Sequence, residues 1–461
     1  MAKTTIQYVC SSCGAKAPQL LGRCPVCGEW GTYEEEIVQQ QRGLTATRSY
    51  SERGLTGEAG QPKRLQDVVA TEEMRLDMHN GEFNRVLGGG LVPGSLVLLG
   101  GEPGIGKSTL ALQVLMQQGE RKTFYASGEE SVRQLKLRAE RLKGDAENLF
   151  ISSETSLERI LEQVKDLEPE IVVIDSIQTI GTEAVDATIG SISQVRECAA
   201  RILEFAKSRN IPFIIIGHIN KEGSLAGPKV LEHIVDTVLQ FEGDQQYMYR
   251  ILRAQKNRFG STSEIGIYEM RQDGLREVSN PSELLLSTAR EGLSGIAIAA
   301  AVEGVRPFLI EVQALVSSAA YGTPQRSSTG FDGRRLNMLL AVLEKRVGFK
   351  LLQKDVFLNI AGGLKVQDPA IDLAVLAAVL SSNMDIPLDA GTCLCGEVGL
   401  AGEIRSVNRI EQRIAEAQKL GFKRILIPAE QKIDPKRFSI EVVGVKKVTD
   451  AFRLLIVKNE K

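Results

Sequence analysis

Residues 101–108 of this 461-residue chain read Gly101-Glu102-Pro103-Gly104-Ile105-Gly106-Lys107-Ser108, and they decide the fold of its central part. The stretch fits the pattern G-x-x-x-x-G-K-[ST], which is typical of phosphate-binding loops. The apolar run at 95–99 predicts a buried strand before the loop, and residues 109–115 predict a helix after it. A chance glycine-rich turn is the competing interpretation, and the flanking strand and helix argue against it.

The residue types in the loop explain how it would hold a nucleotide. Glycines let backbone N–H groups turn toward phosphate oxygens, and the helix amino terminus adds the positive end of its dipole. Lys107 can reach the outer phosphates, and the Ser108 hydroxyl can bind Mg²⁺. We therefore predict ATP and Mg²⁺ as cofactors, with contacts from Gly101, Glu102, Pro103, Gly104, Ile105, Gly106, Lys107, Ser108 and Thr109.

Alternating apolar and amphipathic segments between residues 65 and 280 predict an α/β domain with a mostly parallel sheet. Within it, the apolar strand at 171–175 ends in Asp175. Ligands of open α/β sheets bind at the carboxyl ends of the strands. Asp175 is therefore predicted to hold Mg²⁺ through water and to take part in catalysis.

Two acidic residues follow the predicted strand at 122–127. Glu129 is predicted to be catalytic, because it is placed to orient or deprotonate the attacking water. Glu130 is assigned the simpler role of a charge in the first turn of a helix, which is also the alternative for Glu129. His218 follows another apolar strand, and a γ-phosphate sensor or a satisfied polar strand end are equally open interpretations.

Two segments of this domain are predicted to be loops that project from strand ends. Residues 179–193 are rich in Thr, Gly, Ser and Ala, and residues 220–229 contain glycines and lysines without periodicity. Their expected position beside the nucleotide makes them candidates for coupling hydrolysis to a bound DNA strand, with ordinary surface loops as the alternative. After a strand at 249–254, Lys256 and Arg258 bracket a predicted turn. A solvated loop and a contact with the phosphates of a neighbouring subunit are both open for these two cations.

Four of the seven cysteines fall within the first 27 residues, as two Cys-x-x-Cys pairs that are each followed by glycine. This spacing predicts a tetrahedral Zn²⁺ site. Trp30 and Tyr33 are expected to pack on it, with nucleic-acid stacking as the alternative. Disulfides are the alternative, but a reducing cytoplasm and the small size of the segment argue against them. The predicted zinc ligands are Cys10, Cys13, Cys24 and Cys27.

Composition limits the remaining possibilities. A chain of 461 residues exceeds one core, so we expect two or three domains. The sequence lacks both an apolar run long enough for a membrane span and a signal-peptide core at its start, which predicts a cytoplasmic protein without a membrane partner. The net charge of −2 excludes a bulk polycation. Any nucleic acid would have to bind localised basic loops, or a ring that gathers cations from several subunits.

The motifs together resemble those of the bacterial RadA family, also called Sms, of DNA recombination and repair proteins. The resemblance rests on the zinc knuckle, the phosphate loop and the sequence Lys256-Asn257-Arg258-Phe259-Gly260, which matches the family motif without substitution. It implies a RecA-like ATPase core of the kind found in hexameric replicative helicases. It also implies a DNA-stimulated motor that binds single-stranded and branched DNA, extends branches in recombination intermediates and works with the recombinase RecA. Lys256 and Arg258 are then expected to act catalytically across a subunit boundary.

The last part of the chain resembles the proteolytic domain of the Lon family, in which a catalytic serine follows an Asp-Gly-Pro stretch and a catalytic lysine lies early in a later helix. Here the two positions fall on Ala370 and Glu411, which cannot form a serine-lysine pair. We therefore expect an α+β assembly or DNA-contact domain, with an ATP-dependent protease or protein-remodelling ATPase as the alternative function. The predicted organisation is a zinc-binding module at 1–33, a flexible linker at 34–64, a RecA-like P-loop ATPase domain at 65–280 and a Lon-protease-like domain without its catalytic dyad at 281–461.

Overall fold

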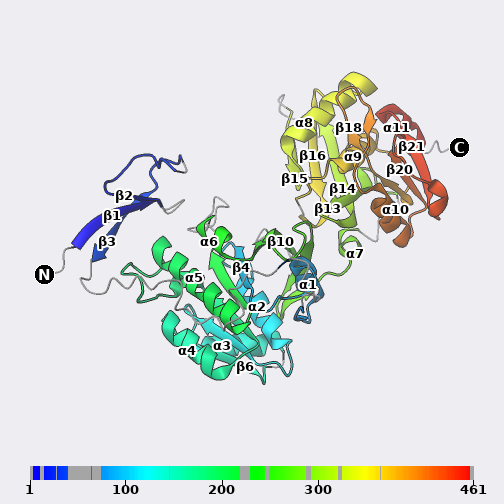
Figure 1. Ribbon diagram of the computed structural model, residues 1–461. Coiled ribbons are helices and arrows are strands. Elements are labelled where there is room, and N and C mark those ends of the chain that lie inside the picture. The colour runs from blue at the N-terminus through cyan, green and yellow to red at the C-terminus, as the bar shows by residue number, and fades with distance from the viewer. Residues whose placement is uncertain are drawn as a thin grey trace. The chain divides into compact units, whose positions relative to one another are not determined.

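The computed structural model describes residues 4–10, 15–26, 28–39, 64, 74–144, 146–218, 229–243, 249–286, 292–319, 324–363 and 365–456 (Figure 1). The chain divides into two compact units. The first comprises Met1–Gln245 and Arg250–Glu277, and the second comprises Gln246–Tyr249 and Val278–Lys461. Among the described residues, none of the helices is long and apolar enough to cross a membrane.

A small antiparallel sheet with the strand order β2-β1-β3 forms the amino-terminal module. Its strands are β1 Thr4–Cys10, β2 Lys16–Ala17 and β3 Tyr33–Gln39. Because β3 pairs with β1 as far as Gln39, residues 34–39 belong to this sheet. The expectation that the flexible linker begins at residue 34 is therefore wrong, since cross-strand pairing extends a segment whose own sequence is polar.

The first unit also contains a nine-stranded sheet with the order β12-β11-β10-β9-β4-β8-β7-β5-β6. From β9 to β6 the pairings are parallel, whereas β10 is antiparallel to β9 and β11 is antiparallel to β12. The strands are β4 Leu96–Gly101, β5 Thr123–Ser127, β6 Leu149–Ser152, β7 Ile171–Asp175, β8 Phe213–His218, β9 Thr237–Glu242, β10 Tyr249–Asn257, β11 Ile265–Arg271 and β12 Gly274–Glu277.

Helices cover both faces of this sheet. Successive side chains of a strand point to opposite faces, so Val97 and Leu99 of β4 join one buried cluster while Leu96 and Leu98 join another. The first cluster includes residues of α1, α2 and α3, and the second includes residues of α4, α5 and α6. The helices are α1 Gly81–Leu87, α2 Lys107–Met116, α3 Val132–Leu142, α4 Leu157–Leu167, α5 Ile192–Arg209 and α6 Lys229–Ile234.

Two local expectations for this unit need correction. β10 continues through Asn257, so Lys256 lies in a strand and not beside a turn, because it pairs with Val238 of β9. The segment 179–193 is not wholly a loop, since α5 begins at Ile192. Residues 220–228 of the other expected loop, 220–229, lie outside the described residues.

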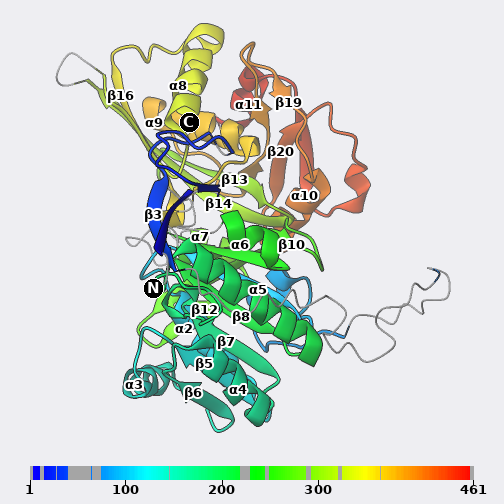
Figure 2. The same cartoon turned by 60° about the vertical axis from the view of Figure 1, so that its left-hand side comes forward.

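The second unit is built on a mixed seven-stranded sheet with the order β15-β16-β14-β13-β17-β20-β21. Residues of α8, α9 and α11 belong to one buried cluster of this unit and residues of α10 belong to another (Figure 2). The strands of the sheet are β13 Ile296–Glu303, β14 Arg306–Ser318, β15 Arg326–Thr329, β16 Lys354–Ile360, β17 Thr392–Leu394, β20 Arg424–Pro428 and β21 Glu441–Val445. The other elements are α7 Pro281–Leu285, α8 Gly333–Val342, α9 Asp372–Met384, α10 Ile410–Lys419, α11 Val448–Leu455 and the hairpin of β18 Glu397–Val398 with β19 Ile404–Arg405.

Candidate nucleotide-binding site

The predicted phosphate-binding loop joins the end of β4 to the start of α2. Gly106 has a φ of 115°, a backbone conformation that glycine adopts readily and that strains a residue with a Cβ atom. Lys107 is buried, and its Nζ atom donates hydrogen bonds to the carbonyls of Gly101 at 2.8 Å and Glu102 at 2.9 Å. Among the other residues predicted to contact the nucleotide, Ile105 is buried. Pro103 and Gly104 are exposed, and Ser108 and Thr109 are half-buried.

Parallel pairing brings the predicted catalytic residues to the same edge of the sheet. Gly101 of β4 is opposite His218 of β8, and Ser127 of β5 is opposite Asp175 of β7. Glu129 follows β5 by two residues and reaches the same edge. The edge therefore combines a loop rich in N–H donors with an amine, an imidazole and two carboxylates, which is a suitable set for binding and hydrolysing a phosphate anhydride.

Asp175 is held in a way that fits a cation. Its side chain is buried, and the hydroxyl of Tyr125 donates a 2.6 Å hydrogen bond to Oδ2. The other oxygen, Oδ1, is buried without a hydrogen-bond partner among the described residues. A buried carboxylate oxygen is stable only when a donor or a cation satisfies it. The position is therefore chemically suited to a hydrated Mg²⁺, together with the hydroxyl of Ser108.

Glu129 and Lys107 are linked through His218. Oε1 of Glu129 accepts a 2.6 Å hydrogen bond from the Ser176 hydroxyl and lies 2.8 Å from Nε2 of His218. The other ring nitrogen of His218 lies 3.3 Å from Nζ of Lys107. A charged lysine only donates, so Nδ1 accepts from Lys107 and Nε2 carries the proton that is shared with Glu129.

These contacts shift the titration of both charged groups. The hydrogen bond from His218, with the bond from Ser176 and the charge of Lys107, lowers the pKa of Glu129 to about 2 against the opposing effect of burial. Burial lowers the pKa of Lys107 to about 8, although the nearby carboxylates of Asp175 and Glu129 favour its charged form. Glu129 is thus a weak base while it contacts His218, and Lys107 is poised near physiological pH.

Glu130 lies outside this arrangement. Its Oε1 atom forms an ion pair with Arg138 of α3. The ion pair therefore connects the segment just before α3 to the helix itself. A structural charge, as assigned from the sequence, is consistent with this pairing.

Lys256 and Arg258, which are expected to act across a subunit boundary and are here called the finger, lie at the opposite edge of the same sheet. Asn257 of β10 is opposite Thr237, which in turn is opposite Val97 near the start of β4, whereas the phosphate loop follows Gly101 at the end of β4. The length of strand between these positions is about 13 Å at a rise of about 3.3 Å per residue. The structure therefore does not bring Lys256 and Arg258 to Lys107 of the same chain.

Each residue of this motif is anchored within the first unit. Lys256 donates from Nζ to the carbonyls of Glu232 at 2.5 Å and Val235 at 2.7 Å, and Arg258 forms a 3.1 Å ion pair with Asp236. Burial, followed by the charge of Arg258, lowers the pKa of Lys256. The remaining contacts are those of Asn257 with the carbonyls of Val86 and Leu87, of the Phe259 carbonyl with Arg75, and of Gly260 with Gly88.

The described part of the predicted DNA-coupling segments is held by one buried glutamine. Gln194 of α5 accepts a hydrogen bond from the Thr182 N–H at 2.9 Å, and its two amide hydrogens are shared among the carbonyls of Thr182, Val185 and Ala187, which lie 2.7 to 3.0 Å from Nε2. These contacts fix residues 182–187 onto α5. The loop after β7 is therefore attached to the helix that follows it, beside the edge that carries Asp175.

The amino-terminal module presents two of the predicted zinc ligands. Cys10 and Cys24 are buried in its small core, and the Tyr33 hydroxyl donates to Sγ of Cys24 at 3.7 Å. Each cysteine starts a turn that its own N–H closes, on Ala15 for Cys10 and on Glu29 for Cys24. Cys13 and Cys27 lie outside the described residues. Two buried thiols in knuckle-like turns are compatible with Zn²⁺ coordination.

Tyr33 packs in the core of this module as expected, whereas Trp30 lies on the outside. Its side chain is 75% exposed, and the guanidinium of Arg23 lies 5.8 Å from its ring centre. The small core is already filled by Cys10, Cys24 and Tyr33 with Ala17, which leaves the larger indole outside.

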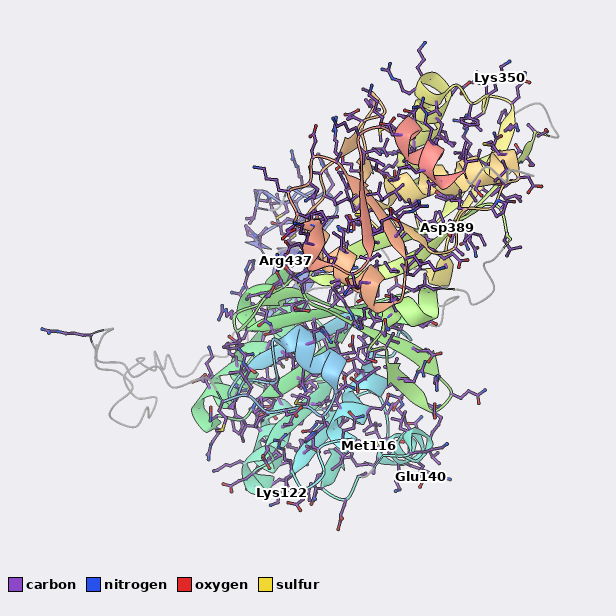
Figure 3. The ribbon with its side chains drawn as sticks, turned by 90° about the vertical axis from the view of Figure 1, so that its right-hand side faces the viewer. Met116, Lys122, Glu140, Lys350, Asp389 and Arg437 are labelled. Atoms are coloured by element: carbon purple, nitrogen blue, oxygen red, sulfur yellow. The ribbon has the colours of Figure 1, made fainter. Side chains whose placement is uncertain are left out.

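In the second unit, the two positions that correspond to the Lon catalytic pair have different surroundings. Ala370 is fully buried, whereas Glu411 is exposed and forms an ion pair with Arg437, which is labelled in Figure 3. Asp368 lies two residues before Ala370, and Arg413 lies two residues after Glu411. Asp368 forms a 2.5 Å ion pair with Arg413, which is fully buried. This ion pair joins the two segments, and neither member can replace the serine or the amine of a serine-lysine pair.

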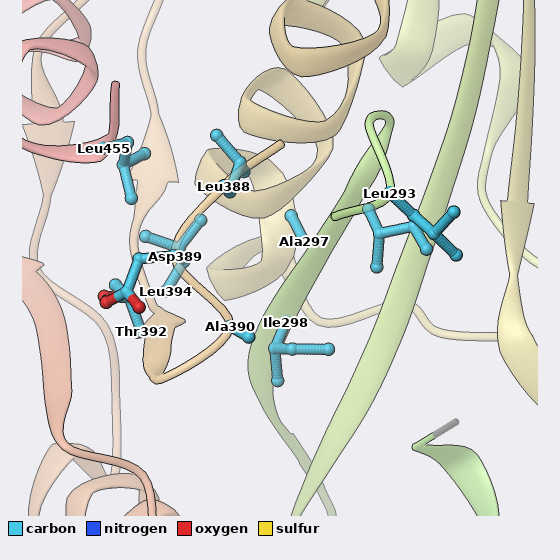
Figure 4. A pocket seen from close by; sticks show the side chains of 10 residues that line it. Leu293, Ala297, Ile298, Leu388, Asp389, Ala390, Thr392, Leu394 and Leu455 are labelled. Atoms are coloured by element: carbon cyan, nitrogen blue, oxygen red, sulfur yellow. The ribbon is translucent and has the colours of Figure 1, made fainter. Parts of the chain in front are cut away.

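A pocket of the second unit lies elsewhere (Figure 4). Its lining is mainly apolar and includes Leu293, Leu388 and Leu455, with Asp389 and Thr392 as polar members. Asp389 accepts a 2.6 Å hydrogen bond from the Thr392 hydroxyl and is therefore satisfied within the protein. Neither Ala370 nor Glu411 lines this pocket.

Three residues around these sites were missed by reasoning from the sequence. Ser176 and Tyr125 bind the two carboxylates of the nucleotide edge, and Asp236 binds Arg258 at the other edge. Ser176 directly follows a strand-end aspartate, and Asp236 directly precedes an apolar strand, so each carried a weak positional signal. The partners of all three depend on strand order, which residue patterns alone do not give.

Comparisons with known proteins agree with these features. Residues 8–35 match the model of a rubredoxin metal binding domain, residues 62–224 that of an AAA domain and residues 331–431 that of subunit ChlI of Mg-chelatase. Two solved structures each align with 44% of the chain. A KaiC-like protein from Pyrococcus horikoshii OT3 is covered over 99% of its length, with 21% identity and a TM-score of 0.38. A RadB recombinase is covered over 100% of its length, with 23% identity and a TM-score of 0.35. Neither likeness is strong enough to carry weight beside the full-length relatives.

Those relatives cover almost the whole chain. The DNA repair protein RadA of Bacillus subtilis strain 168 is 50% identical over 98% of this chain and 99% of its own length. The RadA protein of Listeria monocytogenes is 48% identical over 98% of this chain and 98% of its own length. That of Halalkalibacterium halodurans is 44% identical over 99% of this chain and 100% of its own length. Identity at this level over the full length defines the family. The chain belongs to the RadA family of DNA repair proteins.

Proposed function

We propose that this protein is a cytoplasmic, DNA-dependent ATPase motor of homologous recombination and DNA repair. It binds single-stranded and branched DNA and promotes branch migration, which extends the exchanged strand in recombination intermediates. The observation that carries the proposal is the convergence of Lys107, Glu129 and Asp175 at one sheet edge. Membership of the RadA family supplies the DNA context.

The residues of this edge divide the work of hydrolysis. Lys107 binds the outer phosphates of ATP, and in doing so its amine exchanges the Gly101 and Glu102 carbonyls and His218 for phosphate oxygens. Mg²⁺, held by Ser108 and Asp175, would neutralise charge on the phosphate oxygens. Glu129 orients the attacking water, and its basicity rises once the hydrogen bond from His218 is withdrawn.

Coupling to DNA is assigned to the segments that leave this edge. Residues 182–187 are fixed to α5 by Gln194, so a strand bound there would transmit its position to the helix. The predicted loop at 220–229 begins two residues after His218, which contacts both Glu129 and Lys107. A bound DNA strand that moves this segment would therefore change the environment of the catalytic glutamate.

Lys256 and Arg258 are proposed to act on the nucleotide of a neighbouring subunit in a hexameric ring. Their place at the sheet edge opposite their own phosphate loop supports action in trans. Positive charge from a neighbour stabilises the transition state of phosphoryl transfer. Mixing Lys107→Ala chains with Lys256→Ala chains should then restore some hydrolysis, because about a quarter of the interfaces in a random ring would combine an intact loop with an intact finger.

The other two regions are proposed to support the motor. Cys10, Cys13, Cys24 and Cys27 hold one Zn²⁺ per chain. The second unit stabilises the ring and has no peptidase activity, because Ala370 lacks a nucleophile and Glu411 is paired with Arg437. A protease is therefore disfavoured, and the proposed partners are DNA, the recombinase RecA and further copies of this chain.

ATP hydrolysis measured with and without single-stranded DNA tests the proposal. Single-stranded DNA should raise the rate severalfold, and the Lys107→Ala chain should show no hydrolysis with or without DNA. A rate that is insensitive to DNA, or hydrolysis that depends on an unfolded protein substrate, would contradict the proposed function.

A further inference from the structure

A buried aspartate lies at the base of the proposed finger. Asp236 is 2% exposed and stands between the end of α6 and the first residue of β9. Its Oδ1 atom forms the ion pair with Arg258 at 3.1 Å, and the Asp236 carbonyl accepts a 3.2 Å hydrogen bond from the Arg258 N–H. One residue thus holds both the guanidinium and the backbone of Arg258. The Arg258 side chain itself remains 49% exposed, so its position is fixed while it stays accessible.

The same aspartate is fastened to the strand that leads to the phosphate loop. Its Oδ2 atom accepts a 3.2 Å hydrogen bond from the N–H of Leu96, and its own N–H donates a 3.0 Å bond to the Leu96 carbonyl. Leu96 is the first residue of β4, which ends at Gly101 in the phosphate loop. Because the carboxylate uses a different oxygen for each partner, it joins Arg258 and β4 directly.

Lys256 is anchored to the same short segment. Its Nζ atom donates to the carbonyls of Glu232 and Val235, which lie four residues and one residue before Asp236. Lys207 is a third cation near this point, with Nζ 3.9 Å from Oδ1 of Asp236 and a side chain that is 55% exposed. None of the hydrogen bonds described above connects Lys207 to Leu96 or to the backbone of residues 256–260. Lys207 is therefore a matched control for the loss of a positive charge near Asp236.

We propose that Asp236 is a positioning residue, which presents Arg258 to the nucleotide of the neighbouring subunit and links that finger to the phosphate-loop strand of its own subunit. The inference rests on the proposed action of Lys256 and Arg258 in trans. A displacement of β4 when its own loop binds ATP would be passed through Leu96 and Asp236 to Arg258. Nucleotide binding at one site would in this way influence hydrolysis at the next site around the ring.

Replacing the carboxylate with its amide tests the role of the charge at nearly constant volume. In the full chain, Asp236→Asn should lower kcat by about 10- to 100-fold, because a small misplacement of a catalytic group has an effect of this order. The affinity of the same variant for a fluorescent ATP analogue should change less than about threefold, since its own phosphate loop is intact. Lys207→Gln should leave both quantities near the wild-type values.

Mixed assemblies then separate a positioning role from a general defect. Asp236→Asn chains mixed with Lys107→Ala chains should regain hydrolysis, because the aspartate variant contributes an intact loop and the lysine variant an intact finger. Asp236→Asn mixed with Lys256→Ala should stay inactive, because both chains have a defective finger. Asp236→Glu, which keeps the buried charge but displaces it by one methylene, should follow the same pattern and serves if the asparagine variant does not fold.

The outcomes distinguish the inference from the function on which it rests. Recovery by Lys107→Ala with Lys256→Ala, but not by Lys107→Ala with either Asp236 variant, would overturn the positioning role and leave the finger in place. Failure of Lys107→Ala with Lys256→Ala, despite co-assembly shown by co-purification of differently tagged chains, would remove the finger in trans and the inference with it. A Lys207→Gln variant that behaves like Asp236→Asn would also overturn the inference, because local charge and not the Arg258 contact would then be responsible.

Discussion

Nε2 of His218 lies 2.8 Å from Oε1 of Glu129, and the contact joins two residues that come from different strand ends of the nucleotide edge. The other ring nitrogen contacts Lys107 at 3.3 Å, so a single imidazole bridges the predicted base and the predicted phosphate-binding lysine. The sequence left two interpretations of His218 open. Its position between these groups favours a role in nucleotide sensing over that of a polar strand end.

Glu129→Gln is expected to bind MgATP with near wild-type affinity and to hydrolyse it on the order of 10²- to 10⁴-fold more slowly, because water activation is removed while the charge-binding residues remain. Single-turnover hydrolysis and analogue binding measure the two effects separately. Glu130→Gln is the matched control, since Glu130 binds Arg138 and not the nucleotide edge. A wild-type rate in Glu129→Gln would contradict this role, and a slow Glu130→Gln in the same measurements would transfer the base role to Glu130.

The affinity for ATP is expected to fall as the pH rises above about 8, where Lys107 loses its proton in the free protein. Only the ammonium form pairs with phosphate, so each pH unit above the pKa weakens binding by up to about tenfold. Calorimetric titration with a non-hydrolysable analogue between about pH 7 and 9.5 measures the effect. Lys107→Met should bind weakly and without this dependence, and an affinity that is constant for the wild type would contradict the prediction.

Purified protein is expected to contain one tightly bound Zn²⁺ per chain, because four thiolates satisfy its coordination. Cys27→Ser should lose the metal while the first unit retains ATP hydrolysis. Cys198→Ser is the control, because Cys198 is buried in α5 and burial raises the pKa of its thiol to about 12. Metal analysis that finds no zinc, with the amino-terminal thiols free to react, would exclude the site.

Arg413→Met is expected to destabilise the second unit by about 3 to 5 kcal/mol, because it leaves Asp368 buried without its ion pair. Denaturant unfolding of the full chain, followed by a probe in the second unit, measures the change. Arg437→Met removes the exposed pair with Glu411 and should change the free energy of unfolding by less than about 1 kcal/mol. Equal effects of the two substitutions would contradict this assignment.

Deletion of residues 281–461 is expected to lower the oligomeric state, because the second unit is proposed to hold the ring together. Light scattering of the full and shortened chains at equal concentration measures the assembly, and binding to labelled single-stranded DNA should weaken in parallel. A shortened chain that keeps both the mass of the full assembly and its DNA affinity would place the ring contacts in the first unit.

Local sequence patterns were sufficient for much of the fold and site. The phosphate loop, Asp175 and Glu129 each follow an apolar strand, and parallel strands end at the same edge, so their convergence was predictable. The predicted family and α/β fold class are confirmed, and the matched models of a rubredoxin metal binding domain, an AAA domain and subunit ChlI of Mg-chelatase each cover part of one of the predicted zinc, ATPase and carboxyl-terminal regions.

What the sequence could not provide depends on contacts between distant residues. His218 is 89 residues from Glu129 and 111 from Lys107, so their link required the order of the strands. Asp236 binds the N–H of Leu96, which is 140 residues away in the sequence, and this contact also depends on the order of the strands. Lys256 was predicted beside a turn because its strand is maintained by pairing with β9 and not by its own apolar pattern.

Branch extension on a three-strand recombination intermediate tests the central claim most directly. Wild-type protein with ATP and a recombinase should lengthen the heteroduplex beyond what the recombinase achieves alone, while Lys107→Ala should add nothing. Equal extension by the wild type and Lys107→Ala would contradict the proposal that ATP hydrolysis at this site drives DNA branches.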